Sequence, residues 1–397
     1  MSKTFQIRVA AAASEVDADA WNRLAGDRAC AEDDSGESAN PFLLHAFFEA
    51  AEESGSACAR SGWLPQHLVL EDGSGQPLGI LPCYLKSHSQ GEYVFDHGWA
   101  DAFERAGGSY YPKLQCSVPF TPATGSRLLA AGQPNREAIQ AGLLEGLKQL
   151  CNRHGVSSAH ITFMCEDEWA LAGEAGYLPR TDQQFHWLNQ GYQSFDDFLA
   201  SLSSRKRKNI RKERRTALEE TGITIDWLTG SDLTEEIWDR FFEFYMDTGS
   251  RKWGRPYLTR EFYSRVGEGM GDRIVLVMAK RAGRYIAGAI NFVGDNCLFG
   301  RHWGCIEDHP CLHFEVCYYQ AIEYAIAHGL SRVEAGAQGP HKLARGYVPV
   351  LTHSAHWISH SGLRAAIEDY LQHERRHVDM ENEALMAHMP FRNSGHE

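Results

Sequence analysis

Residues 273–293 read RIVLVMAKRAGRYIAGAINFV, and this stretch decides the fold class. Two apolar runs meet at a short glycine-containing turn, which is the pattern of two antiparallel strands joined by a hairpin. A third apolar run, CLFGRHWGCIED, starts at Cys297, and a helical pattern from Glu315 is stopped by Gly329 before another strand. The order strand, strand, strand, helix, strand predicts an α+β fold, with a mostly antiparallel sheet flanked by helices.

A second copy of this order lies earlier in the chain. It begins with HLVLEDGSGQPLGILPCYL at His67, continues with YVFDHGWAD at Tyr93, and ends with a helix stopped by Gly155 and a further strand. Between its third strand and its helix lies a long insertion near residues 100–134, rich in Gly, Pro, Thr and Tyr. Long loops of this kind in compact domains are usually functional or disordered, and its pair of tyrosines argues against disorder.

A chain of 397 residues is long enough for two domains that each bury a core. We expect an N-terminal domain over residues 1–192 and a C-terminal domain over residues 193–397. The C-terminal domain is predicted to open with a helix at 195–221, because apolar positions recur there at helical spacing and a glycine follows.

The predicted helix is strongly basic, although the chain has a formal net charge of −13. Between Arg205 and Arg215, eight of eleven residues are Lys or Arg. Such a helix gains few ion pairs of its own and suffers like-charge repulsion, which favours an anionic partner over a merely solvated surface. The phosphates of a donor are the partner we expect, with the predicted ligands Arg207, Lys208, Arg211 and Lys212.

The rest of the chain is acidic and should repel polyanions, so any contact with nucleic acid is local and DNA binding is not expected. No secretory signal and no apolar run of about 18 residues is visible, so we expect no membrane span and a cytoplasmic protein. The ten cysteines are scattered without a CxxC pair, which favours reduced thiols over a disulfide framework.

The duplicated order resembles the GNAT acyltransferase fold in tandem, as in the Fem family of peptidoglycan aminoacyl ligases. Three stretches carry this resemblance: RKNIRKERRTALEETGITI, LHFEVCYYQAIEYAIAHGLSRVEAGA and HKLARGYVP. From Asn40 to Trp357 the chain is also similar to the FemAB-like predicted N-acyltransferases of bacteria, in PFLLHAFFEA, YYPKLQ, PFTPATG, SSRKRKNIRKERR, RKWG and EAGAQGPHKLARGY. The resemblance implies two GNAT-like domains and transfer of an acyl or aminoacyl group.

One segment departs from the GNAT pattern. GNAT domains that bind acetyl-CoA carry an Arg/Gln-x-x-Gly-x-Gly/Ala loop whose N–H groups hold the pyrophosphate. The corresponding place reads WGCIEDHPCLHFE, where Glu307 and Asp308 would repel a diphosphate. The donor therefore stays open between acyl-CoA or an acyl-carrier protein and aminoacyl-tRNA, and no tightly bound cofactor is expected.

Acyl transfer to an amine needs a base for the ammonium proton and donors for the developing oxyanion. The predicted catalytic residues are Glu315 or His313 as the base, with Arg301 and His302 from the preceding strand. An alternative is that His313 and Glu315 only charge the first helical turn. The many His and Cys residues around them invite a zinc site, but their spacing fits no standard motif and no metal is expected.

Further residues are predicted to bind substrate or donor. A glycine-rich loop follows the last strand of the second copy and could be plain punctuation, yet its polar side chains suit a carboxylate or phosphate. Helical spacing adds two tyrosines beside Glu315, and RKWGRPY adds a tryptophan for stacking. The predicted binding residues are Trp253, Tyr318, Tyr319, Gln338, His341, Lys342 and Arg345.

The sequence therefore predicts an N-acyltransferase that moves an acyl group from a phosphate-bearing activated donor, acyl-CoA or acyl-carrier protein, to a primary amine of a small molecule or peptide. Two alternatives remain at this point. One is an aminoacyl-tRNA-dependent Fem-type ligase, and the other is a non-catalytic RNA-binding scaffold.

Overall fold

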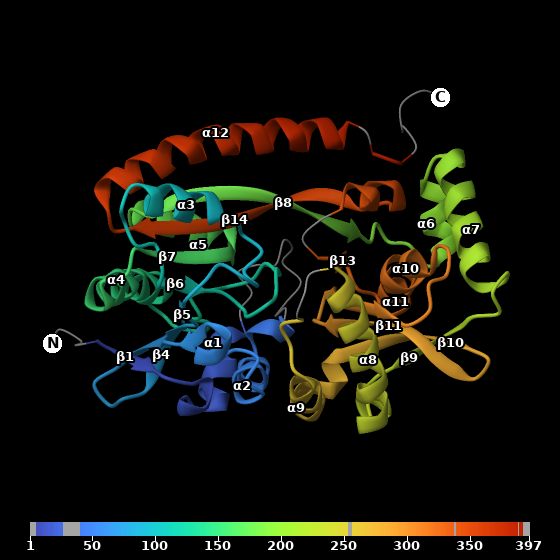
Figure 1. Cartoon of the computed structure of the whole chain (residues 1–397), viewed down its shortest axis with the longest axis horizontal. Helices are drawn as coiled ribbons and strands as arrows, with labels where there is room; N and C mark the ends of the chain where they lie inside the picture. Colours follow the sequence, from blue (N-terminus) through green and yellow to red (C-terminus); the bar gives the residue numbers. More distant parts are fainter. Residues whose placement is uncertain (1–4, 27–39, 253–255, 337–338, 388, 392–397) are drawn as a thin grey trace. The chain divides into compact units, whose positions relative to one another are not determined.

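The computed structural model of the chain describes residues 5–26, 40–252, 256–336, 339–387 and 389–391 (Figure 1). The chain forms two compact units, which we call unit 1 (residues 1–182 and 351–380) and unit 2 (residues 183–350 and 381–397). This division differs from the expected boundary between residues 192 and 193, because a late segment of the chain belongs to unit 1.

Unit 1 contains nine strands and six α-helices, wholly or in part, among its described residues, and these elements follow the chain in this order. They are β1 (Gln6–Ala10), α1 (Ala18–Ala25), α2 (His45–Glu53), β2 (Trp63–Pro65), β3 (His67–Glu71), β4 (Pro77–Leu81), β5 (Tyr84–Lys86), α3 (His97–Arg105), β6 (Lys113–Cys116), α4 (Arg136–His154), β7 (Ser158–Met164), α5 (Glu166–Glu174), the start of β8 (Leu178–Leu188), most of β14 (Val348–Ile358) and most of α12 (Ser361–Met386).

Unit 2 contains the remaining elements. They are α6 (Phe195–Ser201), α7 (Ser204–Leu218), β9 (Thr224–Leu228), α8 (Glu235–Lys252), α9 (Arg260–Met270), β10 (Ile274–Arg281), β11 (Arg284–Val293), β12 (Cys297–Cys305), α10 (Leu312–Phe314), the π-helical turn η6 (Glu315–Tyr319), α11 (Gln320–Ala327), β13 (Arg332–Glu334) and the 3-10 helix η7 (Pro340–Arg345).

The sheet of unit 2 confirms the α+β order expected for the second copy. Strands β10, β11 and β12 are antiparallel neighbours, and β13 pairs with β12 in parallel after the helical run α10–η6–α11. Helix α8 packs closely on β12, since a Cβ at Gly304 would lie 2.1 Å from the carbonyl oxygen of Phe244. The opposite face carries a core of aliphatic and aromatic side chains from α6, α7, α11 and η6.

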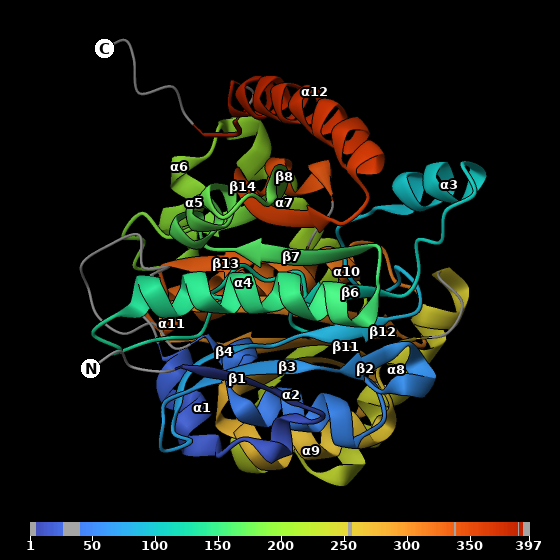
Figure 2. The ribbon, with the colours of Figure 1, turned by 90° about the vertical axis from the view of Figure 1, so that its left-hand side faces the viewer.

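Unit 1 also contains two parallel strands that are joined through a helix, although other strands form the pair. Strands β6 and β7 pair in parallel and α4 lies between them in sequence, as α10–η6–α11 lies between β12 and β13. Helix α4 runs along β7 and covers the apolar face of this sheet (Figure 2). The third strand expected at Tyr93 is wrong: helix α3 begins at His97, and Trp99 and Ala100 form its buried side. The equivalent strand is β6, which lies inside the predicted insertion.

Two strands exchange places between the halves of the sequence, which explains the division into units. Strand β14 follows β13 in the chain, but its residues 353–358 pair with β7 in unit 1. Strand β8 follows α5 of unit 1, but its residues 186–188 pair with β13 in unit 2. Nothing local in the sequence distinguishes these pairings from those of neighbouring strands.

The insertion near residues 100–134 is ordered by buried polar contacts rather than by apolar packing alone. Arg127 is 1% exposed and donates hydrogen bonds to the carbonyl oxygens of Ala123 and Thr162. Glu168 of α5 accepts from the backbone N–H groups of Arg127 and Leu128. These contacts turn a loop rich in turn-forming residues into a fixed part of unit 1.

Three further expectations can be compared with the structure. The basic segment 195–221 forms two helices, α6 and α7, which are separated at Leu202 and Ser203. Eight cysteines are free thiols, whereas Cys165 is disulfide-bonded, so the expectation of reduced thiols is wrong at that residue. Within the described part of the chain, no helix is long and apolar enough to cross a membrane.

Candidate active site in unit 2

A pocket of about 460 Å³ opens in unit 2 where β12 ends and α10 begins. Strand β12 continues past Phe299, which is its last residue paired with β13. The two parallel strands separate beyond this point, so the side chains there can contact a bound molecule. The pocket is lined by Thr248 of α8, by Trp303 and Cys305 of β12, and by residues 307–314. Of the four predicted catalytic residues, His313 lies in this segment, and Arg301, His302 and Glu315 lie beside it.

His313 lies in the wall of this pocket. Its imidazole ring packs edge-on against the indole of Trp303, with ring centroids 5.4 Å apart, and against the ring of Tyr318 at 5.5 Å. These two aromatic rings fix the imidazole plane, and the side chain is only half-buried. The orientation of the His313 imidazole is therefore fixed, and a molecule in the pocket can contact it.

Tyr318 extends this cluster to the loop after β13. Its hydroxyl lies 2.9 Å from Nε2 of His341, which belongs to η7. Burial raises the pKa of Tyr318. Burial, together with the charges of Arg345 and Lys342, lowers the pKa of His341. The pair therefore consists of a protonated phenol and a neutral imidazole at pH 7, as a hydrogen bond between them requires.

Glu315, the first predicted base, is fully buried and its carboxylate is already occupied. Arg214 of α7 donates from Nε and Nη2 to both of its oxygens, at 2.9–3.2 Å, and Gln320 donates a further hydrogen bond at 2.7 Å. Burial raises the pKa of Glu315, against the opposing charge of Arg214. A general base needs a free lone pair that faces the substrate. The prediction of Glu315 as the base is therefore corrected, and its role is structural.

The helix α7 has two faces with different tasks. Arg214 points inward and pairs with Glu315 and, at 2.7 Å, with Glu323. Lys208 and Lys212 are exposed, and neither makes an ion pair with any residue that the structure describes. Arg211 is also exposed and pairs with Asp196 at 2.9 Å. The predicted phosphate ligands thus lie on the outer face, apart from Arg207, which is half-buried.

Lys212 brings the outer face of α7 close to the pocket. Helix α7 packs against α10, η6 and η7. Burial and Glu213 raise the pKa of the pocket residue Cys311, against the opposing charges of Arg345 and Lys212. Glu213 itself accepts hydrogen bonds from the hydroxyl of Tyr319 and, at 2.9 Å, from Arg345. Tyr319 and Arg345 therefore attach α7 to the helical run and to η7, rather than lining the pocket.

The two predicted residues of β12, Arg301 and His302, lie where the pairing with β11 shifts its register, between Gly300 and Trp303. At such an irregularity the regular alternation of side chains between the two faces of a sheet is broken. His302 packs under α8 against the ring of Tyr245, with centroids 5.1 Å apart, and burial and then the Arg301 charge lower its pKa to about 3. Neither His302 nor Arg301 is among the described residues that line the pocket. A catalytic role of His302 and Arg301 stays a prediction.

The remaining predicted residues fall in or near η7. Lys342 is 1% exposed, its ammonium donates to the carbonyl oxygen of Gly336 at 2.8 Å, and burial lowers its pKa to about 8. Lys342 therefore fixes the loop rather than facing the pocket. Trp253 and Gln338 lie outside the described residues. Among the residues that are described, no group of three or more His, Cys, Asp or Glu side chains could hold a metal ion.

Sequence reasoning missed the inward anchor of α7. The spacing of the basic residues predicted two cationic faces of the helix. It did not predict that Arg214 forms ion pairs with Glu315 and Glu323, which lie more than one hundred residues later in the chain. It also missed Phe314, whose ring lies 3.5 Å below the guanidinium of Arg345. A π-helical turn begins at Glu315, and such turns are frequent at functional sites. No sequence pattern predicts a π-helical turn, so this signal is visible only in the structure.

The architecture and the site together define a protein with two GNAT-like units. The structure resembles that of FemX, with 11% identity, a TM-score of 0.53, and coverage of 89% of this chain and 98% of that chain. It also resembles L-PGS from Bacillus licheniformis, with 11% identity, a TM-score of 0.50, and coverage of 85% and 98%. A tandem GNAT protein from the clavulanic acid biosynthesis pathway matches with 13% identity, a TM-score of 0.48, and coverage of 90% and 99%.

The chain belongs to the FemAB-like family, which is described as a family of peptidoglycan biosynthesis/recognition and whose model matches residues 12–393. No curated protein sequence gives a significant match. The predicted resemblance and the predicted GNAT-like fold are confirmed. Family and fold together support a transferase role.

The structural role of the Arg214 ion pair can be tested by unfolding. Arg214→Met leaves the fully buried Glu315 carboxylate without its cation, and we expect it to lower the free energy of unfolding by about 3 kcal/mol in urea denaturation. The matched control is Arg211→Met, which removes an exposed pair on the same helix and should change it by about 0.5 kcal/mol or less. Equal effects of the two substitutions would contradict this assignment.

Proposed function

We propose that the protein is an N-acyltransferase that moves an acyl group from a phosphate-bearing donor to a primary amine bound in the pocket of unit 2. One observation carries this proposal: the wall of one pocket contains both an accessible histidine with a fixed orientation and ionised acidic side chains. The same unit presents a free cationic helix face that suits the phosphates of a donor. The proposal takes the protein to act in the cytoplasm, where both kinds of donor occur.

The pocket offers carboxylates to an amine. Hydrogen bonds from His309, Arg284 and Arg281 lower the pKa of Glu307 to about 2, so its carboxylate is ionised at neutral pH and is paired with these two arginines. Asp308 beside it is exposed. A primary amine is protonated in water and is attracted to the carboxylate of Asp308. We therefore place the acceptor amine in the pocket and the donor's phosphates elsewhere.

His313 is the base in this proposal. It takes a proton from the ammonium group of the acceptor, and the freed nitrogen lone pair attacks the carbonyl carbon of the donor. The tetrahedral intermediate carries a negative oxygen. The attacking nitrogen gives up its second proton to solvent. When the intermediate collapses, the bond to the leaving group breaks, the leaving group takes up a proton from Tyr318, and a neutral amide remains on the acceptor.

Tyr318 is the proton donor in this proposal. Its phenol stays protonated because burial raises its pKa, and the neutral His341 holds its hydroxyl. Its ring packs against the ring of His313, with centroids 5.5 Å apart. In this proposal the hydroxyl reaches the reacting group, where it stabilises the developing oxyanion or gives its proton to the leaving group. This hydroxyl can then be reprotonated through the more exposed His341.

The outer face of α7 supplies the donor's phosphate site. Lys208 and Lys212 are free of ion pairs within the described chain, and α7, which carries them, packs against α10 in the wall of the pocket. Two or three lysines suit the few phosphates of CoA or of a carrier protein's prosthetic arm. A longer row that includes Arg205, Arg211 and Arg215 would also suit the backbone of tRNA, and the family description supports this second candidate, an aminoacyl-tRNA-dependent ligase.

Turnover of the full-length protein tests the chemical assignment. We expect His313→Ala to lower kcat by about 10²-fold or more, as loss of a general base does, and Tyr318→Phe to lower it by about 10²-fold. The measurement is mass spectrometry of the N-acylated product formed from acetyl-CoA or aminoacyl-tRNA and a panel of primary amines. His154→Ala, an exposed histidine of unit 1, is the control. Full activity of both site variants would remove the proposed mechanism.

The protonation of His341 can be followed separately. Its pKa is lowered by burial and by Arg345 and Lys342, so the imidazole should remain neutral as the pH falls to about 6.5 and gain its proton only below that value. The acid limb of kcat that belongs to the Tyr318–His341 pair should therefore lie below pH 6.5. An NMR titration of the His341 ring checks this, and a pKa at or above 6.5 would contradict it.

A further inference from the structure

One face of the sheet in unit 1 is buried and yet polar. Along β5, β6, β7 and β14, side chains alternate between two faces. One face carries Leu85, Leu114, Ala159, Ile161 and Ala355 and forms the apolar core with α4. The other face carries polar side chains that are each 5% exposed or less: Lys86, Lys113, Gln115, Ser158, His160, Thr162, Ser354 and His356.

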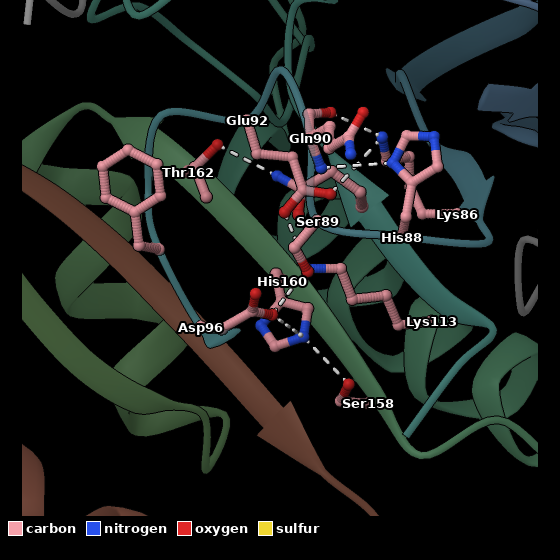
Figure 3. A network of polar contacts seen from close by, with 12 residues as sticks. Lys86, His88, Ser89, Gln90, Glu92, Asp96, Lys113, Ser158, His160 and Thr162 are labelled. Atoms are coloured by element: carbon pink, nitrogen blue, oxygen red, sulfur yellow. Dashed lines mark hydrogen bonds and ion pairs between the residues drawn. The ribbon is translucent and has the colours of Figure 1, made fainter. Parts of the chain in front are cut away.

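This polar face is covered by the segment 87–96, which we call the covering segment (Figure 3). Lys113 contacts Glu92 at 2.6 Å and Asp96 at 2.5 Å through the same ammonium nitrogen. Lys86 donates to the carbonyl oxygen of Gln90 at 2.9 Å. The covering segment is thus attached to the sheet by charged and polar contacts.

A second polar group on the sheet joins the same cluster. His160 lies 2.8 Å from the hydroxyl of Ser158 through Nε2 and 2.7 Å from His356 through Nδ1. The hydroxyl of Tyr110 donates to the Asp96 carboxylate at 2.7 Å. Asp96 therefore stands between a lysine, a tyrosine and a histidine, as Figure 3 shows for Lys113 and His160.

Several buried polar atoms on this face have no partner among the described residues. They are Oε1 of Gln115, Oγ of Ser117 and Nε2 of His356, all in side chains that are 2% exposed or less. Buried polar groups in proteins are nearly always paired, and each exception asks for an explanation. A ligand on this face is such an explanation for Ser117 and His356, since its acceptor atoms can receive hydrogen bonds from the Ser117 hydroxyl and from Nε2–H of His356.

The energetics also favour a ligand site. Burying charged groups costs solvation that ion pairs only partly recover, so an apolar face would stabilise the sheet as well or better. Burial lowers the pKa of Lys86 to about 7, whereas at Lys113 the charges of Glu92 and Asp96 outweigh burial and raise the pKa. Lys113 therefore carries the permanent positive charge of the face.

We propose that this polar face is a binding site for a small dicarboxylate, and that the covering segment is a lid whose Glu92 and Asp96 carboxylates occupy the site when it is closed. Both carboxylates contact one ammonium nitrogen, so they lie as close together as the two acid groups of succinate or glutarate. When the lid opens, a dicarboxylate replaces them at Lys113, and Gln115, Thr162 and His160 are exposed beside it.

Features of the covering segment itself suit a lid. Tyr93 has a φ of +61°, which is strained for a residue with a side chain. The ring of Phe95 is 55% exposed, unusual for phenylalanine. Besides its contacts to the polar face, the segment is attached by polar contacts of Ser87, His88, Ser89 and Phe95. Its apolar contacts include Val94, which is 7% exposed, and Gly91, which packs against the ring of Phe120, and opening the lid breaks them.

Calorimetric titration of the full-length protein with glutarate tests the proposal. Wild type should bind glutarate, and Asp96→Asn should bind it at least ten times more tightly because one internal competitor is removed. Asp101→Asn, an exposed neighbour on α3, is the matched control and should leave the affinity unchanged. Lys113→Met should abolish binding. Absence of binding to both wild type and Asp96→Asn, or binding that survives Lys113→Met, would overturn the proposal.

Hydrogen exchange of the wild-type protein gives an answer that depends on no variant. With saturating glutarate, the backbone amides of residues 87–96 should exchange faster, because the lid is displaced, while those of β6 and β7 should be unchanged or slower. A fixed structural network predicts equal or slower exchange throughout, and that result would overturn the lid. Neither test requires acyl transfer, so they stand apart from the function proposed for unit 2.

Discussion

The ion pair between Arg214 and Glu315 is the interaction on which the architecture of the candidate site depends. A fully buried carboxylate is costly unless it is paired and hydrogen-bonded, and here one guanidinium and one amide satisfy it. Because Glu315 begins the π-helical turn that carries Tyr318, the same pair fixes the start of the helical run that walls the pocket. Arg214 also forms an ion pair with Glu323 of α11, so α7 is attached to both η6 and α11.

This attachment divides the charge of α7 between two tasks. An acidic chain that concentrates eight cations in eleven residues must either pair these cations with carboxylates or leave them exposed to a binding partner. The inward Arg214 is paired, whereas Lys208 and Lys212 are exposed and make no ion pair among the described residues. In the function proposed here, this cationic helix face binds the phosphates of the donor while the pocket binds the amine acceptor. It would then take the part of the glycine-rich pyrophosphate loop that the sequence lacks.

The sequence predicted the parts of the fold that depend on local patterns. The apolar runs from Ile274 to Cys305 form the expected strands, and the basic block forms a helix. The segment after Tyr93 was expected to be a strand because it mirrored the end of β12, but its Trp99 and Phe103 stand four residues apart, at helical spacing, and it folds as α3. The exchange of β8 and β14 depends on pairings between distant segments, which no local pattern encodes. At the site, the pairs that decide function also join distant residues, so the sequence supplied His313 and Tyr318 but not the burial of Glu315.

The most direct test of the account is donor binding to the outer face of α7. Calorimetric titration of the full-length protein with acetyl-CoA should show an affinity that falls as the salt concentration rises. Lys208→Gln combined with Lys212→Gln should weaken binding by about tenfold, a loss of about 1.4 kcal/mol. The control Lys280→Gln, in an exposed pair with Asp226, should leave binding unchanged. An affinity for acetyl-CoA that ignores both salt and the α7 lysines would contradict the account, as would binding of aminoacyl-tRNA alone.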